Sequence, residues 1–408
     1  MSAKPSSESA ASSVSSAVPP FDPSDPLGLD DLLTDEDRAV RDTVRSWAAE
    51  RVLPQIADWY ERGELPGIRE LARELGSLGA LGMSLTGYGC AGASAVQYGL
   101  ACLELEAADS GIRSLVSVQG SLAMYAIWRF GSEEQKQQWL PGMAAGEIIG
   151  CFGLTEPDIG SDPAAMRTYA KRDGGGDWVL NGRKMWITNG SVAGVAVVWA
   201  RTDDGIRGFV VPTDTPGFSA PEIKHKWSLR ASVTSELVMD EVRLPADAVL
   251  PEATGLRGPL GCLSHARYGI VWGSMGAARA SFEAALDYAK TREQFGKPIG
   301  GFQLTQAKLA DMAVELHKGI LLAHHLGRRM DAGRLRPEQI SFGKLNNVRE
   351  AIEICRTART ILGANGISLE YPVMRHATNL ESVLTYEGTV EMHQLVLGKA
   401  LTGLDAFR

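Results

Sequence analysis

The hydrophobic pattern of the chain changes twice, from helical to strand-like and back to helical, and this order constrains the fold more than any single motif. Residues 28–150 repeat apolar side chains at helical spacing, as in "ASAVQYGLACLELEAAD". Residues 151–252 are rich in β-forming side chains separated by turn residues, and residues 253–408 return to long helical runs. We therefore predict an α+β protein with a helical N-terminal domain, a middle β domain and a helical C-terminal domain.

Local signals refine this outline at three places. Thr34 is followed three residues later by Asp37, a pattern typical of the first turn of a helix. Asn181-Gly182 lies between two β-rich runs, which predicts a hairpin turn there. The start of the chain is rich in Ser, Ala and Pro and has little apolar surface to bury, so residues 1–27 are predicted to form a disordered tail.

Charge and cysteine usage narrow the class of protein. The net charge of −8 at pH 7 argues against a nucleic-acid partner, which would bind a basic surface. No apolar run reaches the roughly 18 residues that can cross a bilayer, so we expect no membrane span. The five cysteines are scattered without CxxC spacing, and the N-terminus has no apolar signal segment. These features predict reduced thiols in a cytoplasmic protein, with neither a disulfide nor a metal site.

Two glycine-containing stretches could bind a cofactor. "CFGLTEPDIGSD" (151–162) begins as a strand and continues as a turn rich in N–H and hydroxyl donors. Such a turn can hold a pyrophosphate or the polar edge of a ring, although a plain strand-to-turn junction has the same pattern. "GYGCAG" (87–92) matches the dinucleotide pattern GxGxxG. Helical patterning follows it where a second strand would be needed, so we interpret it as a turn between helices.

Five segments occur in one order along the chain: "CFGLTEPDIGSD", "KMWIT" (184–188), "TREQFGKPIGGFQ" (291–303), "ILGANGISLEYP" (361–372) and "TYEGT" (385–389). Together they resemble the acyl-CoA dehydrogenase family of flavoproteins, over essentially everything after the tail. The resemblance implies FAD as cofactor, a middle β-barrel or sandwich domain, a C-terminal four-helix bundle and a homotetramer. It also implies an electron-transfer flavoprotein as electron acceptor. Where the family commonly has two adjacent glycines this chain reads "ILGANG", and Ala364 adds only a methyl group.

Glu387 stands between Tyr386 and Gly388 on an otherwise apolar helical stretch. A dehydrogenase of thioesters needs a base for the α-proton, and burial in an apolar pocket raises the pKa of a carboxylate toward that task. By resemblance, Glu387 is the catalytic base. The glycine after it lets a thioester approach the backbone, where the N–H of Glu387 can polarise the carbonyl. The alternative is a glutamate that faces water.

The resemblance also assigns the cofactor contacts. Within the subunit, FAD would contact Phe152, Leu154, Thr155, Gly160, Ser161, Trp186, Ile187, Thr188 and Thr389. Residues that would reach FAD from a neighbouring subunit are Arg292, Gln303 and the 360–364 stretch with Thr360, Leu362, Gly363 and Ala364, together with Phe295. Phe407 is also expected at the cofactor, and the CoA chain would follow Leu260 and Ser264, with Arg267 as a cationic anchor.

The acyl end of the site is predicted from one helical stretch. Arg113 and Ser117 are four residues apart, hence on one helix face, and Glu106 is seven residues before the arginine. A pocket for a simple fatty chain should be apolar, and a buried guanidinium is costly unless an anion meets it. A dicarboxylic acyl chain would supply that anion. The pattern resembles the branch that oxidises and decarboxylates glutaryl-CoA, whose substrate contacts would include Ser114, Ser161, Tyr386 and Gly388.

Three alternatives remain open. Arg113 could be an internal ion-pair partner of Glu106 without a role toward the substrate. The enzyme could act on another short, branched or aromatic acyl chain, or on glutaryl-CoA without decarboxylation. The protein could also be an inactive flavin-binding scaffold, against which the presence of Glu387 and of the flavin segments argues.

Overall fold

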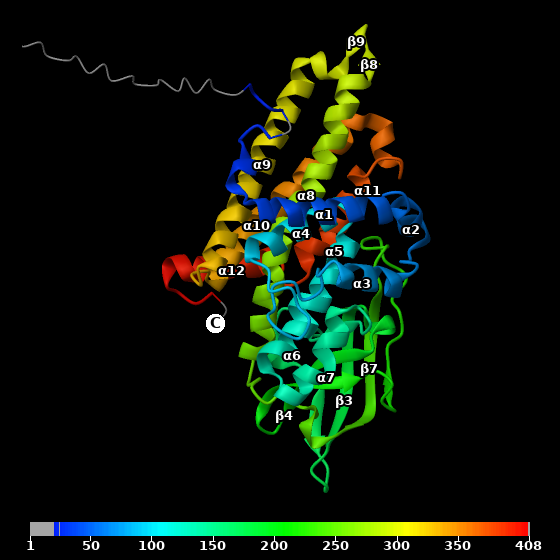
Figure 1. Ribbon diagram of the computed structural model, residues 1–408, viewed down its shortest axis with the longest axis vertical. Helices are drawn as coiled ribbons and strands as arrows, with labels where there is room; N and C mark the ends of the chain where they lie inside the picture. The colour runs from blue at the N-terminus through cyan, green and yellow to red at the C-terminus, as the bar shows by residue number, and fades with distance from the viewer. Residues whose placement is uncertain (1–19, 24, 407–408) are drawn as a thin grey trace, which may run out of the picture.

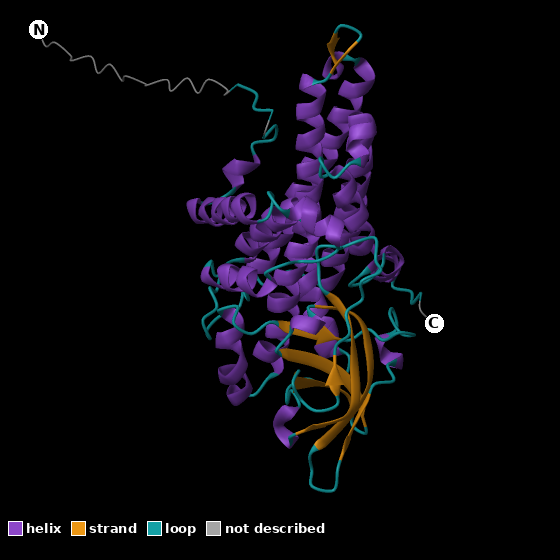
Figure 2. Ribbon diagram, turned by 90° about the vertical axis from the view of Figure 1, so that its right-hand side faces the viewer, coloured by secondary structure: helices purple, strands orange, loops and turns teal. Residues whose placement is uncertain are grey.

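The computed structural model describes residues 20–23 and 25–406. A β-sheet lies at one end of the molecule, and helices from the N-terminal and C-terminal parts of the chain pack together above it (Figures 1 and 2). The observed architecture is thus α+β with the order predicted from the hydrophobic pattern. No helix in the described ranges is long and apolar enough to span a bilayer.

The N-terminal part is helical, as predicted, and it begins with the predicted capping box. The Thr34 hydroxyl accepts from the Asp37 N–H at 3.2 Å, and the Asp37 carboxylate accepts from the Thr34 N–H at 3.0 Å. Of the predicted tail, residues 1–19 and 24 lie outside the described residues, whereas Asp25 already accepts two backbone N–H groups. The helices are α1 (Asp35–Arg51), α2 (Ile56–Arg62), α3 (Ile68–Ser77), α4 (Ala95–Ala108), α5 (Ser110–Ser117), the π-helical η2 (Val118–Met124), α6 (Tyr125–Phe130) and α7 (Glu133–Ala144).

The strands of the middle part are β1 (Gly150–Gly153), β2 (Tyr169–Arg172), β3 (Trp178–Thr188), β4 (Val195–Thr202), β5 (Gly205–Pro212), β6 (Phe218–Ser219) and β7 (Thr234–Leu244). Their order is β1-β4-β2-β3-β7-β6, with β5 also paired to β4. Among the described residues β5 and β6 end the sheet without pairing with each other, so the sheet stays open. The implied barrel is therefore not closed, because no hydrogen-bonded strand pair joins its two ends.

Asn181 and Gly182 lie inside β3, so the predicted hairpin turn is wrong. The register against β7 shifts at Gly182, which marks a β-bulge. Gly182 has φ 144°, and a Cβ atom there would lie 2.5 Å from the hydroxyl of Thr168. The turn between β2 and β3 instead spans residues 173–177, where the Asp173 carboxylate accepts two backbone N–H groups. Glycine is needed at this position for close packing and not for a change of chain direction.

The C-terminal part is a helical bundle in which α8 packs against α9, α10 and α11, and α10 packs against α9 and α11. Helix α4 of the N-terminal part also packs on α8, so one apolar core joins both helical parts. The elements are α8 (Arg257–Thr291), β8 (Glu293–Gln294), β9 (Lys297–Pro298), α9 (Gln303–Asp331), α10 (Pro337–Leu362), α11 (Val373–Thr385) and α12 (Val390–Thr402). Short 3-10 helices are η1 (Leu29–Leu32), η3 (Pro163–Ala165), η4 (Gly190–Val192), η5 (Ala246–Ala248), η6 (Ile299–Gly301) and η7 (Gly363–Ile367).

Candidate active site

A tight turn over residues 386–388 connects α11 to α12. Glu387 adopts a left-handed conformation with φ 53°, and Gly388 follows with φ 99°. A left-handed backbone costs a residue with a side chain roughly 1–2 kcal/mol, and such residues collect at functional sites. A Cβ atom on Gly388 would lie 3.0 Å from Nε2 of His393. The turn therefore needs glycine after Glu387, and it holds the glutamate in a conformation that only the surrounding structure can maintain.

The Glu387 side chain points into the protein. Its Oε2 atom is buried and has no hydrogen-bond partner among the described residues. Burial raises the pKa of the carboxyl group, and the nearby positive charges of Arg113, Lys344 and Arg267 oppose this rise. A carboxylate with a raised pKa and an unpaired oxygen suits a general base that collects a proton from carbon.

Arg113 on α5 lies at the bottom of the same region, with 1% of its side chain exposed. Its Nε donates to Glu106 on α4 at 2.7 Å, and one amino nitrogen donates to the Tyr386 hydroxyl. The other Glu106 oxygen accepts from the Ser110 hydroxyl at 2.8 Å. Burial opposes the charge of Arg113, but Glu106 and Tyr386 outweigh it, and the net effect raises the pKa of the guanidinium. The anion that a buried arginine requires is thus already present, so burial alone does not demonstrate a dicarboxylic substrate.

Helix α5 also carries two buried hydroxyl groups, that of Ser114 near Tyr386 and that of Ser117 near Tyr98. The hydroxyl oxygens of Ser114 and Ser117 are buried and make no hydrogen bond within the described part of the chain. The positive charges of three basic side chains act on Glu387. Glu106, which accepts from Arg113, is the second carboxylate of this cluster. The cluster therefore has basic side chains and unused hydrogen-bonding capacity, both suited to an additional anion.

The two segments expected to contact the flavin ring lie next to each other. The N–H of Met185 donates to the carbonyl of Thr155 at 2.8 Å, which joins the end of β1 to β3. Trp186 has φ 62° and is 58% exposed, so a large flat side chain stands free beside this junction. Ile187 and Thr188 continue β3, whereas Phe152 and Leu154 are buried and Thr155 is partly buried. An exposed indole beside hydroxyl groups fits a flavin ring.

The loop after β1 adds further polar groups to this edge. Gly160 and Ser161 are exposed, and a Cβ atom on Gly160 would meet nothing within 4 Å. Thr389 lies at the start of α12, where its hydroxyl accepts the N–H of Met392 at 3.3 Å. Open backbone and hydroxyl groups of this kind can hold phosphate oxygens.

The second set of predicted cofactor residues lies at the opposite end of the molecule, near the β8–β9 hairpin at the top of Figure 1. Within one subunit the structure does not bring these residues to Trp186. Phe295 is 95% exposed, and Gly363 and Ala364 are exposed in η7, whereas Leu362 is buried. Arg292, Gln303 and Thr360 are exposed as well, and Phe407 lies outside the described residues.

Helix α8 lines the approach to the turn. Leu260 is 40% exposed, and the Ser264 hydroxyl donates to its carbonyl at 2.9 Å. One helical turn further on, Nε of Arg267 donates to the carbonyl of Glu387 at 2.6 Å. Arg267 therefore binds the 386–388 turn directly.

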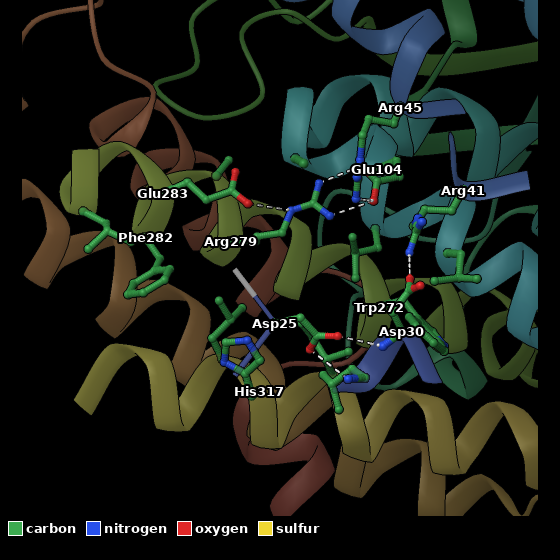
Figure 3. A pocket seen from close by; sticks show the side chains of 18 of the residues that line it. Asp25, Asp30, Arg41, Arg45, Glu104, Trp272, Arg279, Phe282, Glu283 and His317 are labelled. Carbon is green, nitrogen blue, oxygen red and sulfur yellow. Dashed lines mark hydrogen bonds and ion pairs between the residues drawn. The ribbon is translucent and has the colours of Figure 1, made fainter. Parts of the chain in front are cut away.

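A cavity of about 1060 Å³ lies elsewhere, between the N-terminal segment, α1, α8 and α9 (Figure 3). Several of its charged groups pair with one another. Glu104 pairs with both Arg45 and Arg279, and Asp30 pairs with Arg41. The residues of the 386–388 turn are not among those that line this cavity.

The sequence interpretation missed Lys344. This lysine lies on α10 with 2% exposure and donates to the carbonyls of Tyr386 and Gly388. A signal was present, since Lys344 falls at helical spacing between Ile340 and Val348, on the buried side of the helix.

Comparison with known proteins agrees with these features. Three family models match in order: the acyl-CoA dehydrogenase N-terminal domain over residues 34–147, its middle domain over 151–242 and its C-terminal domain over 253–402. The crystal structure of glutaryl-CoA dehydrogenase from Mycobacterium smegmatis is 72% identical, with a TM-score of 0.93, and the match covers 94% of this chain and 99% of that one.

Two further relatives are similar over most of their length. A glutaryl-CoA dehydrogenase from Mycobacterium smegmatis in complex with FADH2 is 65% identical, with a TM-score of 0.92, covering 93% of this chain and 98% of that one. The mitochondrial short-chain specific acyl-CoA dehydrogenase of Bos taurus is 34% identical over 375 residues, 90% of each chain. With three consecutive domain models matched, the chain belongs to the acyl-CoA dehydrogenase family of FAD-dependent oxidoreductases.

Proposed function

We propose that this protein oxidises and decarboxylates glutaryl-CoA to crotonyl-CoA and CO2, with FAD as cofactor and an electron-transfer flavoprotein as electron acceptor. The observation that carries the substrate is the buried Arg113 on α5, the helix on which the buried hydroxyls of Ser114 and Ser117 have no hydrogen-bond partner among the described residues. A free carboxylate at the far end of the acyl chain would accept from these donors and lie close to the positive charge of Arg113. The two similar crystal structures named glutaryl-CoA dehydrogenase support the same substrate.

Glu387 would act first, as the base that takes the α-proton. The N–H of Glu387 donates no hydrogen bond within the described residues, so it is free to bind the thioester oxygen as negative charge develops there. Bound FAD supplies the acceptor for the β-hydrogen and its electron pair. Glu387 would thus take the Cα proton, and FAD would supply the acceptor for the hydride from Cβ.

Decarboxylation would follow at the other end of the acyl chain. The bond to the terminal carboxyl group breaks, CO2 leaves, and its electron pair remains on the carbon skeleton as a dienolate. Protonated Glu387 returns a proton to carbon and gives crotonyl-CoA. The pKa of Glu387, raised by burial, favours a carboxyl group that holds this proton until it is needed.

Product analysis tests this function. The FAD-containing protein is incubated anaerobically with glutaryl-CoA, and the acyl-CoA product is identified by mass. Crotonyl-CoA with one equivalent of CO2 is the expected result. An unsaturated product that retains the terminal carboxyl group would show a non-decarboxylating enzyme, and an unchanged flavin spectrum would contradict the substrate.

A short straight-chain substrate is the second candidate, because the bovine relative named short-chain specific is similar over 90% of each chain. Butyryl-CoA would leave Ser114 and Ser117 without partners, and an unsatisfied buried hydroxyl costs about 1–3 kcal/mol. We therefore expect glutaryl-CoA to reduce the flavin faster than butyryl-CoA at equal concentration.

We infer that the protein is a homotetramer. The residues Arg292, Phe295 and Gln303 are exposed at the end of the molecule opposite the sheet, where they cannot reach the flavin segments of their own subunit. A neighbouring subunit would bring them there. Light scattering should give four subunits with one FAD each, and a monomer that retains a full complement of FAD would contradict this assembly.

A further inference from the structure

Lys344 and Arg267 hold three successive carbonyl groups of the catalytic turn. Nζ of Lys344 donates to the carbonyl of Gly388 at 2.6 Å and to the carbonyl of Tyr386. The carbonyl between these two, that of Glu387, accepts from Nε of Arg267 at 2.6 Å. Two cations from two different helices, α10 and α8, thus bind the backbone on both sides of the left-handed residue.

These contacts fix the direction of the free N–H group. In a trans peptide the C=O and N–H groups point in opposite directions. Because the Tyr386 carbonyl points to Lys344, the N–H of Glu387 points away from Lys344. This N–H has no partner within residues 20–23 and 25–406, so the lysine orients a donor that the fold itself does not use.

Lys344 also differs from an ordinary buried lysine in its charge environment. Within the described chain it makes no ion pair at 4.0 Å or less, although its side chain is 2% exposed. Burial lowers the pKa of Lys344 to about 7, whereas the charge of Glu387 opposes this shift and favours the charged form of the lysine. The lysine in turn favours the ionised form of Glu387. The ammonium group of Lys344 therefore interacts with the turn and with the Glu387 carboxylate, and no other acidic side chain among the described residues pairs with it.

We propose that Lys344 is a positioning residue for the reaction, because its ammonium holds the backbone on both sides of Glu387 so that the carboxylate and the N–H face one thioester. This inference rests on the proposed role of Glu387 as base. It assigns to α10 a part in the chemistry that does not require contact with substrate or cofactor.

The first test replaces Lys344 by methionine, which keeps the length of the side chain and removes its donors. Flavin reduction by glutaryl-CoA is followed under anaerobic conditions by stopped flow, with FAD content measured on the same sample. We expect a loss of about 10²-fold in the reduction rate, since a misplacement of about 1 Å can have this effect. FAD content should stay near one per subunit.

The pH profile separates positioning from simple destabilisation. Without the cation, the pKa of Glu387 should rise, so the ascending limb of the reduction rate should move to higher pH. The charged or titratable groups that face Glu387 are Glu106 from α4, Arg113 from α5, Arg267 from α8, Lys344 from α10, Tyr386 from the turn and His393 from α12. Apart from Lys344, all remain in the variant.

Two further variants keep the test decisive. Lys344→Gln keeps a neutral donor and should fall between wild type and Lys344→Met. Asn347→Leu, three residues along α10, removes buried hydrogen bonds to the carbonyls of Val271 and Gly319, so it should lower the melting temperature without changing the reduction rate. If wild type is reduced rapidly while Lys344→Met and Lys344→Gln keep its rate and pH profile, the positioning role is wrong. If glutaryl-CoA fails to reduce even wild type, the proposed function fails first.

Discussion

Two buried lysines, Lys184 in the sheet and Lys344 in the bundle, show how the same residue type can serve stability or chemistry. Lys184 is fully buried, donates to the Leu154 carbonyl at 3.1 Å and pairs with Glu156 at 2.9 Å. Glu156 in turn accepts from two backbone N–H groups. Among the described residues Lys344 donates hydrogen bonds to backbone carbonyls and to no carboxylate, and its charge interacts with that of Glu387 at longer range.

The difference teaches which buried charges remain available for a reaction. The charge of Lys184 is matched by a carboxylate in direct contact, so the pair joins the end of β1 to β3 and has little effect beyond this junction. The charge of Lys344 has no such partner, and the group it influences is the carboxylate with an unpaired oxygen. A carboxylate whose two oxygens both accept hydrogen bonds, as in Glu156, stabilises the fold. A carboxylate with an unpaired oxygen, as in Glu387, can accept a proton.

The largest effect is expected from a change of Glu387, the carboxylate that Lys344 influences. Glu387→Gln keeps the shape of the side chain but cannot accept the α-proton, so flavin reduction should slow by about 10²–10⁴-fold. Because the change removes the carboxylate charge that favours the charged form of the buried Lys344, the melting temperature should fall. Stopped-flow reduction and thermal unfolding of the same sample measure both effects. A variant that reduces its flavin at the wild-type rate would place the base elsewhere.

The Lys184 side should give the opposite outcome. Lys184→Met leaves the buried Glu156 carboxylate without its cation, which typically costs about 3–5 kcal/mol of unfolding free energy. Flavin reduction, normalised to bound FAD, should change far less than in Glu387→Gln. The double variant Lys184→Met with Glu156→Gln removes the uncompensated charge and should recover much of the lost stability. Equal stability of the single and double variants would argue against a paired role.

Arg113 combines both kinds of behaviour, since it is paired with Glu106 and faces donors that are unpaired. Arg113→Ala should reduce kcat/KM for glutaryl-CoA by roughly 2–5 kcal/mol in transition-state terms, as for the loss of one partner of a desolvated charge pair. Activity with butyryl-CoA should hold steady or rise. Arg113→Lys keeps the charge without the planar fork and should fall between wild type and Arg113→Ala.

An equal loss with both substrates would make Arg113 a purely internal partner of Glu106, which is the alternative that the sequence left open. The ion pair at 2.7 Å shows that the internal role exists. Comparing the activity of Arg113→Ala with glutaryl-CoA and with butyryl-CoA tests whether Arg113 also binds the substrate.

The smallest expected effect is a pH dependence of stability. Burial lowers the pKa of Lys184 to about 8, from 10.5 in the unfolded chain, with Glu156 partly opposing the shift. Between these two values the unfolded state binds more protons than the folded state, so this residue adds stability as the pH rises from 8 toward 10.5. The difference in unfolding free energy between wild type and Lys184→Met should therefore widen over this range. Chemical denaturation at several pH values measures it, and a constant or narrowing difference would contradict the shift.

Much of the fold followed from local patterns because such patterns are set by neighbouring residues. Helical spacing predicted both helical parts, and the pair Thr34 and Asp37 predicted the start of α1, since capping involves backbone groups three residues away. The pair Asn181-Gly182 gave the wrong prediction because a bulge and a turn both need a glycine with unusual φ. Close packing against Thr168, the residue before β2, decided between them.

By itself, the sequence determined the order of helical and β parts, the family and the identity of Glu387 as the expected base. Only the tertiary structure decided which charged side chains around Glu387 are paired with one another. Glu106, Arg113, Arg267 and Lys344 come from four different helices and meet at one turn. Neither periodicity nor a motif could show that Arg113 already has a carboxylate partner or that Lys344 lacks one. The physical reason is that pKa and hydrogen bonding depend on distances in space between groups that are far apart along the chain.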